Sequence, residues 1–176
     1  MRRFEVRFGG LGGQGTVLAG TILGHAAILS GLYATRTSSY GAEVRGTYAY
    51  GHVVVSDEPV KYPFAIALDA LVALHSKALD MELKLLKNDG LLMIDDEFID
   101  REIGGSYKIV KIPAAKLAVE RFGRRVFANM IMLGSLLRFI KFIPIESAEL
   151  AIRDNIKVET DKNVEALRLG FGLQVD

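Results

Sequence analysis

The sequence predicts an α/β protein with a mainly parallel sheet, and three observations support this prediction. Short runs rich in β-branched and aromatic residues alternate with helical patterns along the first part of the chain. Beyond Pro113 the patterns are helical only. The length of 176 residues suits one domain. We therefore expect a single domain over residues 1–176, a Rossmann-like three-layer domain with a helical C-terminal portion.

The N-terminal elements follow from local signals. "FEVRF" at 4–8 predicts a strand, and the apolar run 16–30 predicts a helix that ends before Gly31. A second strand is expected over 32–37 and a third over 48–56, where β-branched and aromatic residues dominate. The alternation implies crossover connections and a sheet covered on both faces.

Further strands and a series of helices complete the chain. "ALVAL" at 70–74 predicts a short buried strand, and Ser76 is the expected cap of a helix over 76–86. "NDG" at 88–90 predicts a turn before the strand "LLMID" at 91–95. A last strand is expected over 107–112. The helices expected after Pro113 cover 114–122, 127–142, 147–155 and 162–169.

Composition excludes several classes of function. The formal net charge is +1 and 24% of the residues are charged, so no overall field attracts nucleic acid or an acidic membrane. The chain has no cysteine, which excludes disulfides, sulfur-ligated zinc and iron–sulfur ligation by this chain. Its three histidines, His25, His52 and His75, are widely spaced, so no metal site is expected.

The charge-free stretch 8–35 follows "MRRFEVR" and superficially resembles a targeting segment. Eight glycines interrupt it, however, and the apolar run 126–137 is too short to cross a bilayer. We expect a cytoplasmic protein without a membrane partner.

The stretch "FGGLGGQG" is the first candidate binding feature. Gly10, Gly12 and Gly15 match G-x-G-x-x-G between a predicted strand and a predicted helix, the context of a dinucleotide-binding turn. Free amides at the start of such a helix attract anions. The acid that would bind a ribose about 20 residues further on is replaced by Arg36. Two alternatives stay open: an NADP-binding reductase that uses Arg36, or glycines that serve only tight packing.

The second candidate feature is "TSSYGAEVRGTYAYG" at 37–51. It follows a predicted strand, so we expect it at the same rim as the glycine turn, where open α/β sheets bind ligands. Arg45 can clamp a phosphate or carboxylate, and Glu43 can orient Arg45. The alternative is a surface loop with an exposed ion pair.

No residue set predicts a catalytic centre in this chain. Asp95 and Asp96 are adjacent, but neighbours on an extended chain point to opposite sides, and Asp95 is better interpreted as a strand-end cap or loop anchor. No G-x-S-x-G nucleophile motif is present. We therefore assign no catalytic residue.

Several motifs in order resemble a known family. "GGLGGQG", "SYGAEVRG", "NDGLLMIDDEFI", "IPAAKLA", "FANMIMLGSL" and "KNVEALRLGFGL" are similar to the gamma subunit of 2-oxoacid:ferredoxin oxidoreductases. The likeness runs nearly from end to end. It implies one subunit of an enzyme, inactive alone, that oxidatively decarboxylates a 2-oxoacid with CoA to acyl-CoA and CO2 and reduces ferredoxin.

The resemblance also implies cofactors and partners. Thiamine diphosphate, Mg and iron–sulfur clusters would be held by alpha and beta subunits, with or without a ferredoxin-like delta subunit, and ferredoxin would accept the electrons. The absence of cysteine agrees with this division. The isolated chain could form a homodimer, and a purely structural assembly module is a further alternative. The short chain favours a 2-oxoglutarate or branched-chain type by analogy.

The resemblance places CoA, as co-substrate, near this chain. Asn129 is a weaker candidate for a contact with CoA than the residues of the two glycine-containing motifs. A polar residue that opens an apolar helix can equally be a cap or a buried hydrogen-bonding group. Thr47 stands where family members commonly have glycine, and threonine disfavours positive φ. The implied CoA-facing residues are Gly10, Gly12, Gly13, Gln14 and Gly15 in the turn, Ser39, Tyr40, Gly41, Glu43, Arg45 and Gly46 in the loop, and Asn129.

Overall fold

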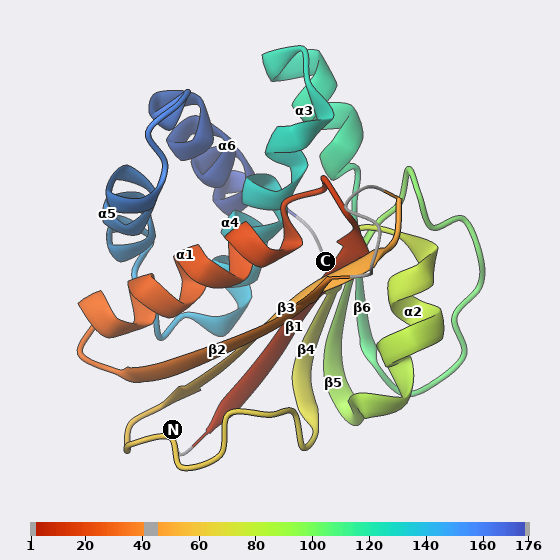
Figure 1. Ribbon diagram of the computed structural model, residues 1–176. Coiled ribbons are helices and arrows are strands. Elements are labelled where there is room, and N and C mark those ends of the chain that lie inside the picture. Colours follow the sequence, from red (N-terminus) through yellow and green to blue (C-terminus); the bar gives the residue numbers. More distant parts are fainter. Residues whose placement is uncertain (1–2, 41–45, 175–176) are drawn as a thin grey trace.

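A computed structural model describes residues 3–40 and 46–174 as one mixed sheet with helices on both faces (Figure 1). The strands are β1 (Phe4–Leu11), β2 (Tyr33–Tyr40), β3 (Tyr48–Ser56), β4 (Leu68–Ala73), β5 (Leu86–Asp95) and β6 (Lys108–Ile112). The helices are α1 (Thr16–Leu29), α2 (Ser76–Glu82), α3 (Ala114–Phe122), α4 (Ala128–Ile140), α5 (Ile145–Asn155) and α6 (Thr160–Gly172), with short 3₁₀ turns at Leu83–Leu85 and Arg125–Phe127. The predicted α/β class and helical C-terminal portion are confirmed.

The strand order is β2-β3-β1-β4-β5-β6. The pairs β1–β4, β4–β5 and β5–β6 are parallel, whereas β3 runs antiparallel to both β1 and β2. β3 can be reversed because no helix precedes or follows it directly, and antiparallel neighbours need no crossover. One consequence is that β3 separates β2 from β1, which would be neighbours in a dinucleotide-binding sheet.

Alternation along the strands produces two cores, one on each face of the sheet. Val6 and Phe8 of β1 and Val53 of β3 face the larger core, which also contains the apolar sides of α1, α3, α4, α5 and α6. Leu71 and Leu92 face a smaller core under α2 on the opposite side of the sheet. Figure 1 shows α2 alone on that side and the other helices together on the first. Period-two alternation directs neighbouring side chains to opposite faces, so both layers follow from the strand pattern.

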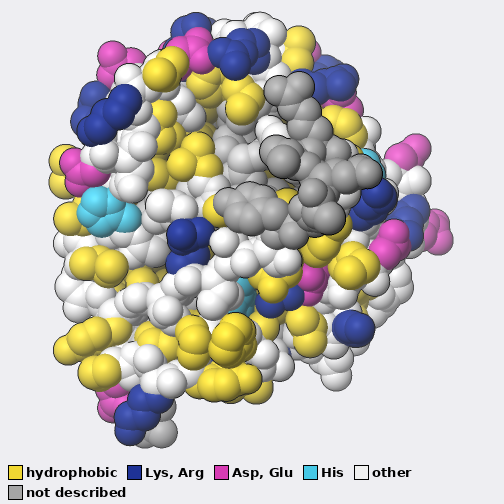
Figure 2. All heavy atoms as spheres, in the orientation of Figure 1, with side chains coloured by type: hydrophobic (Ala, Val, Ile, Leu, Met, Phe, Trp, Pro, Cys, Tyr) yellow, Lys and Arg dark blue, Asp and Glu magenta, His cyan; other side chains and the backbone are white. Residues whose placement is uncertain are grey.

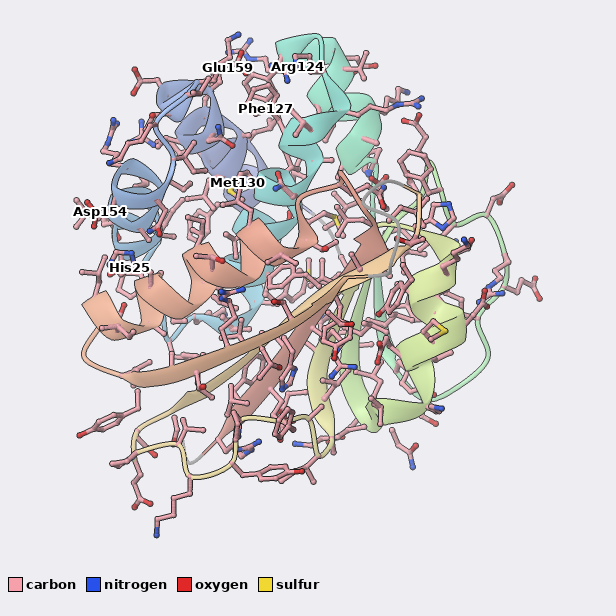
Figure 3. All side chains as sticks on the ribbon, viewed as in Figure 1. His25, Arg124, Phe127, Met130, Asp154 and Glu159 are labelled. Atoms are coloured by element: carbon pink, nitrogen blue, oxygen red, sulfur yellow. The ribbon has the colours of Figure 1, made fainter. Side chains whose placement is uncertain are left out.

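Polar contacts at the surface connect the helices that cover the larger side of the sheet (Figure 3). Arg124, just before α4, pairs with Glu159, just before α6, at 2.5 Å. His25 of α1 lies 3.7 Å from Asp154 of α5. Such exposed pairs stabilise little individually, so the apolar contacts beneath them hold this layer in place.

Two local predictions were wrong. The helix that begins at Ser76 ends at Glu82, and its cap is His75, whose Nδ1 accepts a hydrogen bond from the Lys77 amide at 3.2 Å. The segment 88–90 is not a turn that ends a helix but part of β5, where the pairing with β4 shifts register.

Candidate functional site

The glycine turn joins the carboxyl end of β1 to the start of α1. Gly13 and Gly15 have positive φ angles of 97° and 74°, a conformation that favours glycine. The turn lies at the sheet edge where the parallel strands β1 and β4 end (Figure 1). Open α/β sheets bind ligands at this edge, so the position agrees with a binding turn.

Gln14 stabilises the turn from inside. Its Oε1 accepts a hydrogen bond from the Leu11 amide at 2.6 Å, and its Nε2 donates to the Leu74 carbonyl at 2.9 Å. A Cβ added to Gly10 would lie 2.6 Å from this same Oε1. The space at Gly10 is therefore filled by Gln14, whose side chain connects β1 to Leu74, the residue that follows β4.

Asn129, in the first turn of α4, fills the space at Gly15. Its Nδ2 donates to the Gly15 carbonyl at 3.1 Å, and its Oδ1 accepts from the Met130 amide at 2.8 Å. A Cβ on Gly15 would lie 2.1 Å from Nδ2. Asn129 thus makes the buried hydrogen bonds that the sequence left open as an alternative to a ligand contact. Gly13 differs, because nothing lies within 4 Å of a Cβ added there.

The second candidate feature begins in β2 and returns in β3. Ser39 is exposed at the end of β2, and Tyr40 pairs with Ala49 of β3. Gly46 is exposed with a φ of 79°. The predicted residues Gly41, Glu43 and Arg45 lie outside the described residues.

Both flanks of this loop lie beside the glycine turn. Ala49, the partner of Tyr40, also pairs with Gly10, and the Gly12 amide donates to the Thr47 carbonyl at 2.8 Å. Among the described non-glycine residues, only Lys141 and Glu159 have positive φ, so Thr47 needs no glycine-like conformation. The two sequence features are brought to one edge of the sheet.

A cavity of about 140 Å³ opens between the glycine turn and the start of α4. Gly13 and Gln14 line it on one side, and Phe98 and Arg125 on another. Arg125 pairs with Glu97 at 2.6 Å, and its guanidinium carbon lies 5.5 Å from the centre of the Phe98 ring. Small-molecule sites usually enclose about 300–1,000 Å³, so this cavity alone is smaller than a typical ligand site. No sequence pattern indicated Phe98 or Arg125.

A buried polar cluster lies under α2, close to the glycine turn. Arg7 of β1 forms an ion pair with Glu82, and Tyr48 donates a hydrogen bond to the same carboxylate at 2.7 Å. The Arg7 guanidinium lies 4.1 Å from the centre of the Tyr50 ring. Burial and the Glu82 carboxylate hold the pKa of Tyr48 well above its usual range. Tyr48 therefore stays neutral and acts as a donor that fixes Glu82.

Asp95 anchors the start of α3 at the end of β5. It is fully buried, and its carboxylate accepts hydrogen bonds from the amides of Ala115 at 3.0 Å and Glu97 at 3.3 Å. Burial raises its pKa to about 6. This confirms the interpretation of Asp95 as a strand-end cap.

The raised pKa of Asp95 predicts a pH-dependent stability. Between pH 3.8, the ordinary value, and about 6, the folded protein holds a proton that the unfolded chain has released, so the free energy of unfolding falls as pH rises. The full effect is on the order of 2–3 kcal/mol. Urea unfolding at pH 4, 5, 6 and 7 should show wild type losing stability relative to Asp95→Asn. A pH-independent difference between the two proteins would contradict this assignment.

Arg36, the residue on which an NADP-binding alternative depends, is distant from the glycine turn. It pairs with Val53 of β3, which pairs with Val6 of β1. Arg36 is thus two strand spacings, about 10 Å, from β1, and the turn begins roughly 15 Å further along the strand direction. This placement disfavours a shared dinucleotide site.

An apolar surface lies at the far end of β2 and on the segment between β3 and β4. Tyr62, Phe64 and Ile66 of that segment are each more than half exposed, and Arg3 donates hydrogen bonds to the carbonyls of Tyr62 and Phe64. Figure 2 shows hydrophobic side chains gathered over the lower part of this face. Contiguous exposed apolar patches mark interaction sites in soluble proteins.

Two absences concern the described residues only. No helix among them is long and apolar enough to span a membrane. Nor do residues 3–40 and 46–174 contain a group of three or more His, Asp or Glu side chains that could hold a metal ion.

Comparison with known proteins identifies the class of protein. The model of the pyruvate ferredoxin/flavodoxin oxidoreductase family matches residues 5–173, and the chain belongs to this family. Within it, the chain is a gamma subunit of a 2-oxoacid:ferredoxin oxidoreductase complex.

Individual relatives cover almost the whole chain. The 2-oxoglutarate synthase subunit KorC of Methanothermobacter thermautotrophicus is 40% identical, over 96% of this chain and 93% of its own. The pyruvate synthase subunit PorC of the same organism is 30% identical, over 95% and 93%. The crystal structure of a keto/oxoacid ferredoxin oxidoreductase gamma subunit from Geobacter sulfurreducens superimposes with a TM-score of 0.87 at 33% identity, over 97% of this chain and 95% of that one.

Proposed function

We propose that this chain serves a complex that oxidatively decarboxylates 2-oxoglutarate with CoA, forming succinyl-CoA and CO2 and reducing ferredoxin. The observation that carries this choice is the difference in identity, 40% to the 2-oxoglutarate synthase subunit and 30% to the pyruvate synthase subunit of one organism. Chains of similar length are compared in both cases, so the difference is not an effect of coverage.

The redox and carbanion chemistry belongs to partner subunits in this proposal. Iron–sulfur clusters need thiolate ligands, and the chain has no cysteine. Thiamine diphosphate with Mg, held by the alpha and beta subunits, would supply the electron sink for decarboxylation. The residues of this chain would position CoA and help to assemble the complex in the cytoplasm.

The glycine turn and the 39–46 loop would form one wall of the CoA site. Gly13 is open to solvent, and the adjacent cavity of about 140 Å³ is too small for the whole of CoA. A second subunit must therefore complete the site. Arg45 is proposed to contact an anionic group of CoA, with Glu43 orienting it, because both belong to the loop whose flanks adjoin the turn.

Kinetics of the purified complex, with this chain in place, test the proposal. We expect the highest kcat/KM with 2-oxoglutarate, compared with pyruvate and a branched-chain oxoacid. Arg45→Ala should raise the KM for CoA roughly tenfold through loss of a charge-assisted contact, with CoA-independent decarboxylation unchanged. Arg36→Ala is the matched control, since Arg36 is exposed and remote from the turn.

Other outcomes would assign other functions. A preference for pyruvate would refute the substrate assignment but leave the family unchanged. Equal loss of decarboxylation and of CoA-dependent turnover in Arg45→Ala would instead indicate an assembly role. Saturable NADPH binding that depends on Arg36 would support the reductase alternative.

A further inference from the structure

A long groove lies at the edge of the sheet opposite the glycine turn. It consists of two neighbouring cavities of about 770 and 550 Å³, which share Lys108 and Phe139 in their linings. Lys108 is the first residue of β6 and pairs with Leu91 of β5, which also lines the groove. The last turn of α4 and the start of α5 form the other wall. We call this feature the basic groove.

The larger cavity of the basic groove has unneutralised positive charge. Lys108, Arg138 and Lys141 are exposed at its rim, and Glu146 is the carboxylate among its described lining residues. No described carboxylate lies within 4.0 Å of any of the three cations.

The absence of a carboxylate partner is unusual for Arg138, although it is common among the described lysines. Most described arginines have a carboxylate partner, including the pairs Arg121–Glu165, Arg153–Asp161 and Arg168–Glu149. Arg138 and Arg36 are the described arginines without one. A local excess of cations without internal partners favours an anionic partner from outside.

Contacts that leave their charge free hold two of the three cations, Lys108 and Arg138, in place. The Lys108 ammonium lies 4.8 Å from the centre of the Phe139 ring, and Arg138 Nη1 donates to the Phe171 carbonyl at 3.4 Å. Lys141 ends α4 with a φ of 58°, where glycine is the favoured residue. The chain thus has a lysine at a position where its backbone conformation costs free energy.

The floor of the groove is apolar, because Phe139, Ile145 and Phe171 are only partly buried there. A basic rim over an apolar floor matches a peptide that has carboxylates on either side of an apolar side chain. The second cavity is lined by Asp69 and Asp89, so the carboxylates of such a peptide would bind in the larger cavity only.

We propose that the basic groove binds an acidic segment of another subunit of the oxidoreductase complex. An apolar side chain of that segment packs on Phe139 and Phe171, and its carboxylates pair with Lys108, Arg138 and Lys141. The proposal rests on membership of a multi-subunit complex, not on the choice of oxoacid or on the position of CoA.

Assembly of the co-expressed complex, measured by mass photometry on dilution, tests this proposal. Arg138→Glu with Lys141→Glu should weaken association of this chain at least about tenfold near 0.1 M salt, and wild-type association should weaken as salt is raised. The control variant combines Lys84→Glu with Lys116→Glu and reverses the same number of exposed charges outside the groove. A complex that contains this control should assemble like wild type. Association of the groove variant equal to that of the control would overturn the proposal.

A photo-crosslinker identifies the occupant without removing any cation. Benzoylphenylalanine in place of Glu146, on the rim, should crosslink in the intact complex to an acidic peptide of another subunit, as read by mass spectrometry. Crosslinks to a second copy of this chain, to no partner, or to a segment without acidic residues would overturn the proposal. Crosslinking abolished by CoA would assign the groove to the nucleotide instead. Normal assembly of the groove variant would overturn the proposal even if its CoA kinetics changed, because the proposed CoA site lies at the other edge of the sheet.

Discussion

Replacing Gly15 with alanine is expected to destabilise the protein by roughly 2–4 kcal/mol. Alanine at a φ of 74° costs about 1–2 kcal/mol, because its Cβ approaches the backbone in the left-handed region. The remaining destabilisation arises because this Cβ would lie 2.1 Å from Asn129 Nδ2. The Asn129 side chain would therefore have to move and lose its hydrogen bond to the Gly15 carbonyl. Urea unfolding of the purified chain measures the loss.

Gly13→Ala is the matched control, since Gly13 also has positive φ but open space around it. Its free energy of unfolding should fall only by the cost of placing alanine in a backbone conformation with positive φ. The cost of Gly15→Ala should fall to a similar value in an Asn129→Ala background, where the obstructing amide is absent. Equal costs for Gly13→Ala and Gly15→Ala in the wild-type background would show that the contact with Asn129 is unimportant.

The glycine turn shows what a local pattern can and cannot predict. The sequence correctly indicated a turn between a strand and a helix, because glycine spacing and flanking periodicity are local properties. It did not indicate what occupies the space that the glycines leave. Gln14 fills the space at Gly10, and Asn129, 114 residues away from Gly15, fills the space at Gly15. Only the tertiary structure brings that pair together.

Local signals likewise predict some secondary-structure elements correctly and miss others. The predicted helix 114–122 and strand 48–56 coincide with α3 and β3, where capping, proline and β-branched signals are strong. The prediction of a turn at 88–90 that ends a helix was wrong, because β5 already begins at Leu86. The "NDG" residues lie where the register shifts, since β4 pairs with Leu86 and then with Leu91, so the local signal marked an irregularity inside the strand.

The candidate site was only partly accessible to sequence reasoning. Position at a strand end correctly indicated that the two described flanks of the segment 37–51, which lie in and next to β2 and β3, adjoin the glycine turn. Strand direction determines the edge of the sheet at which a strand ends. Phe98 lies in "NDGLLMIDDEFI", which indicated only the family resemblance, and Arg125 lies outside the quoted motifs, so neither was indicated as a lining residue of the adjacent cavity. The proposed roles of Glu43 and Arg45 stay predictions, since both lie outside the described residues.

Replacing Gly170 with alanine is expected to destabilise the protein by about 3 kcal/mol or more, through the contact between α4 and α6. A Cβ on Gly170 would lie 1.9 Å from the Ile131 carbonyl oxygen, and one on Gly134 would lie 2.0 Å from the Leu167 carbonyl oxygen. These obstacles are backbone atoms, so no side-chain rotation relieves them and the helices must separate. Separation would also break the hydrogen bond that Ser135 Oγ donates to the Gly170 carbonyl at 2.9 Å.

Gly172→Ala provides the comparison within the same helix, because nothing lies within 4 Å of a Cβ added at Gly172. Alanine is favoured over glycine in helices, so this variant should be neutral or stabilised by up to about 1 kcal/mol. For a chain of this size, the loss in Gly170→Ala corresponds to a fall in Tm of roughly 6–12 °C. If both variants melted like wild type, α4 and α6 could not be in backbone contact at Gly170. A lower Tm in Gly170→Ala alone would show that close helix packing, rather than helix propensity, determines the residue at this position.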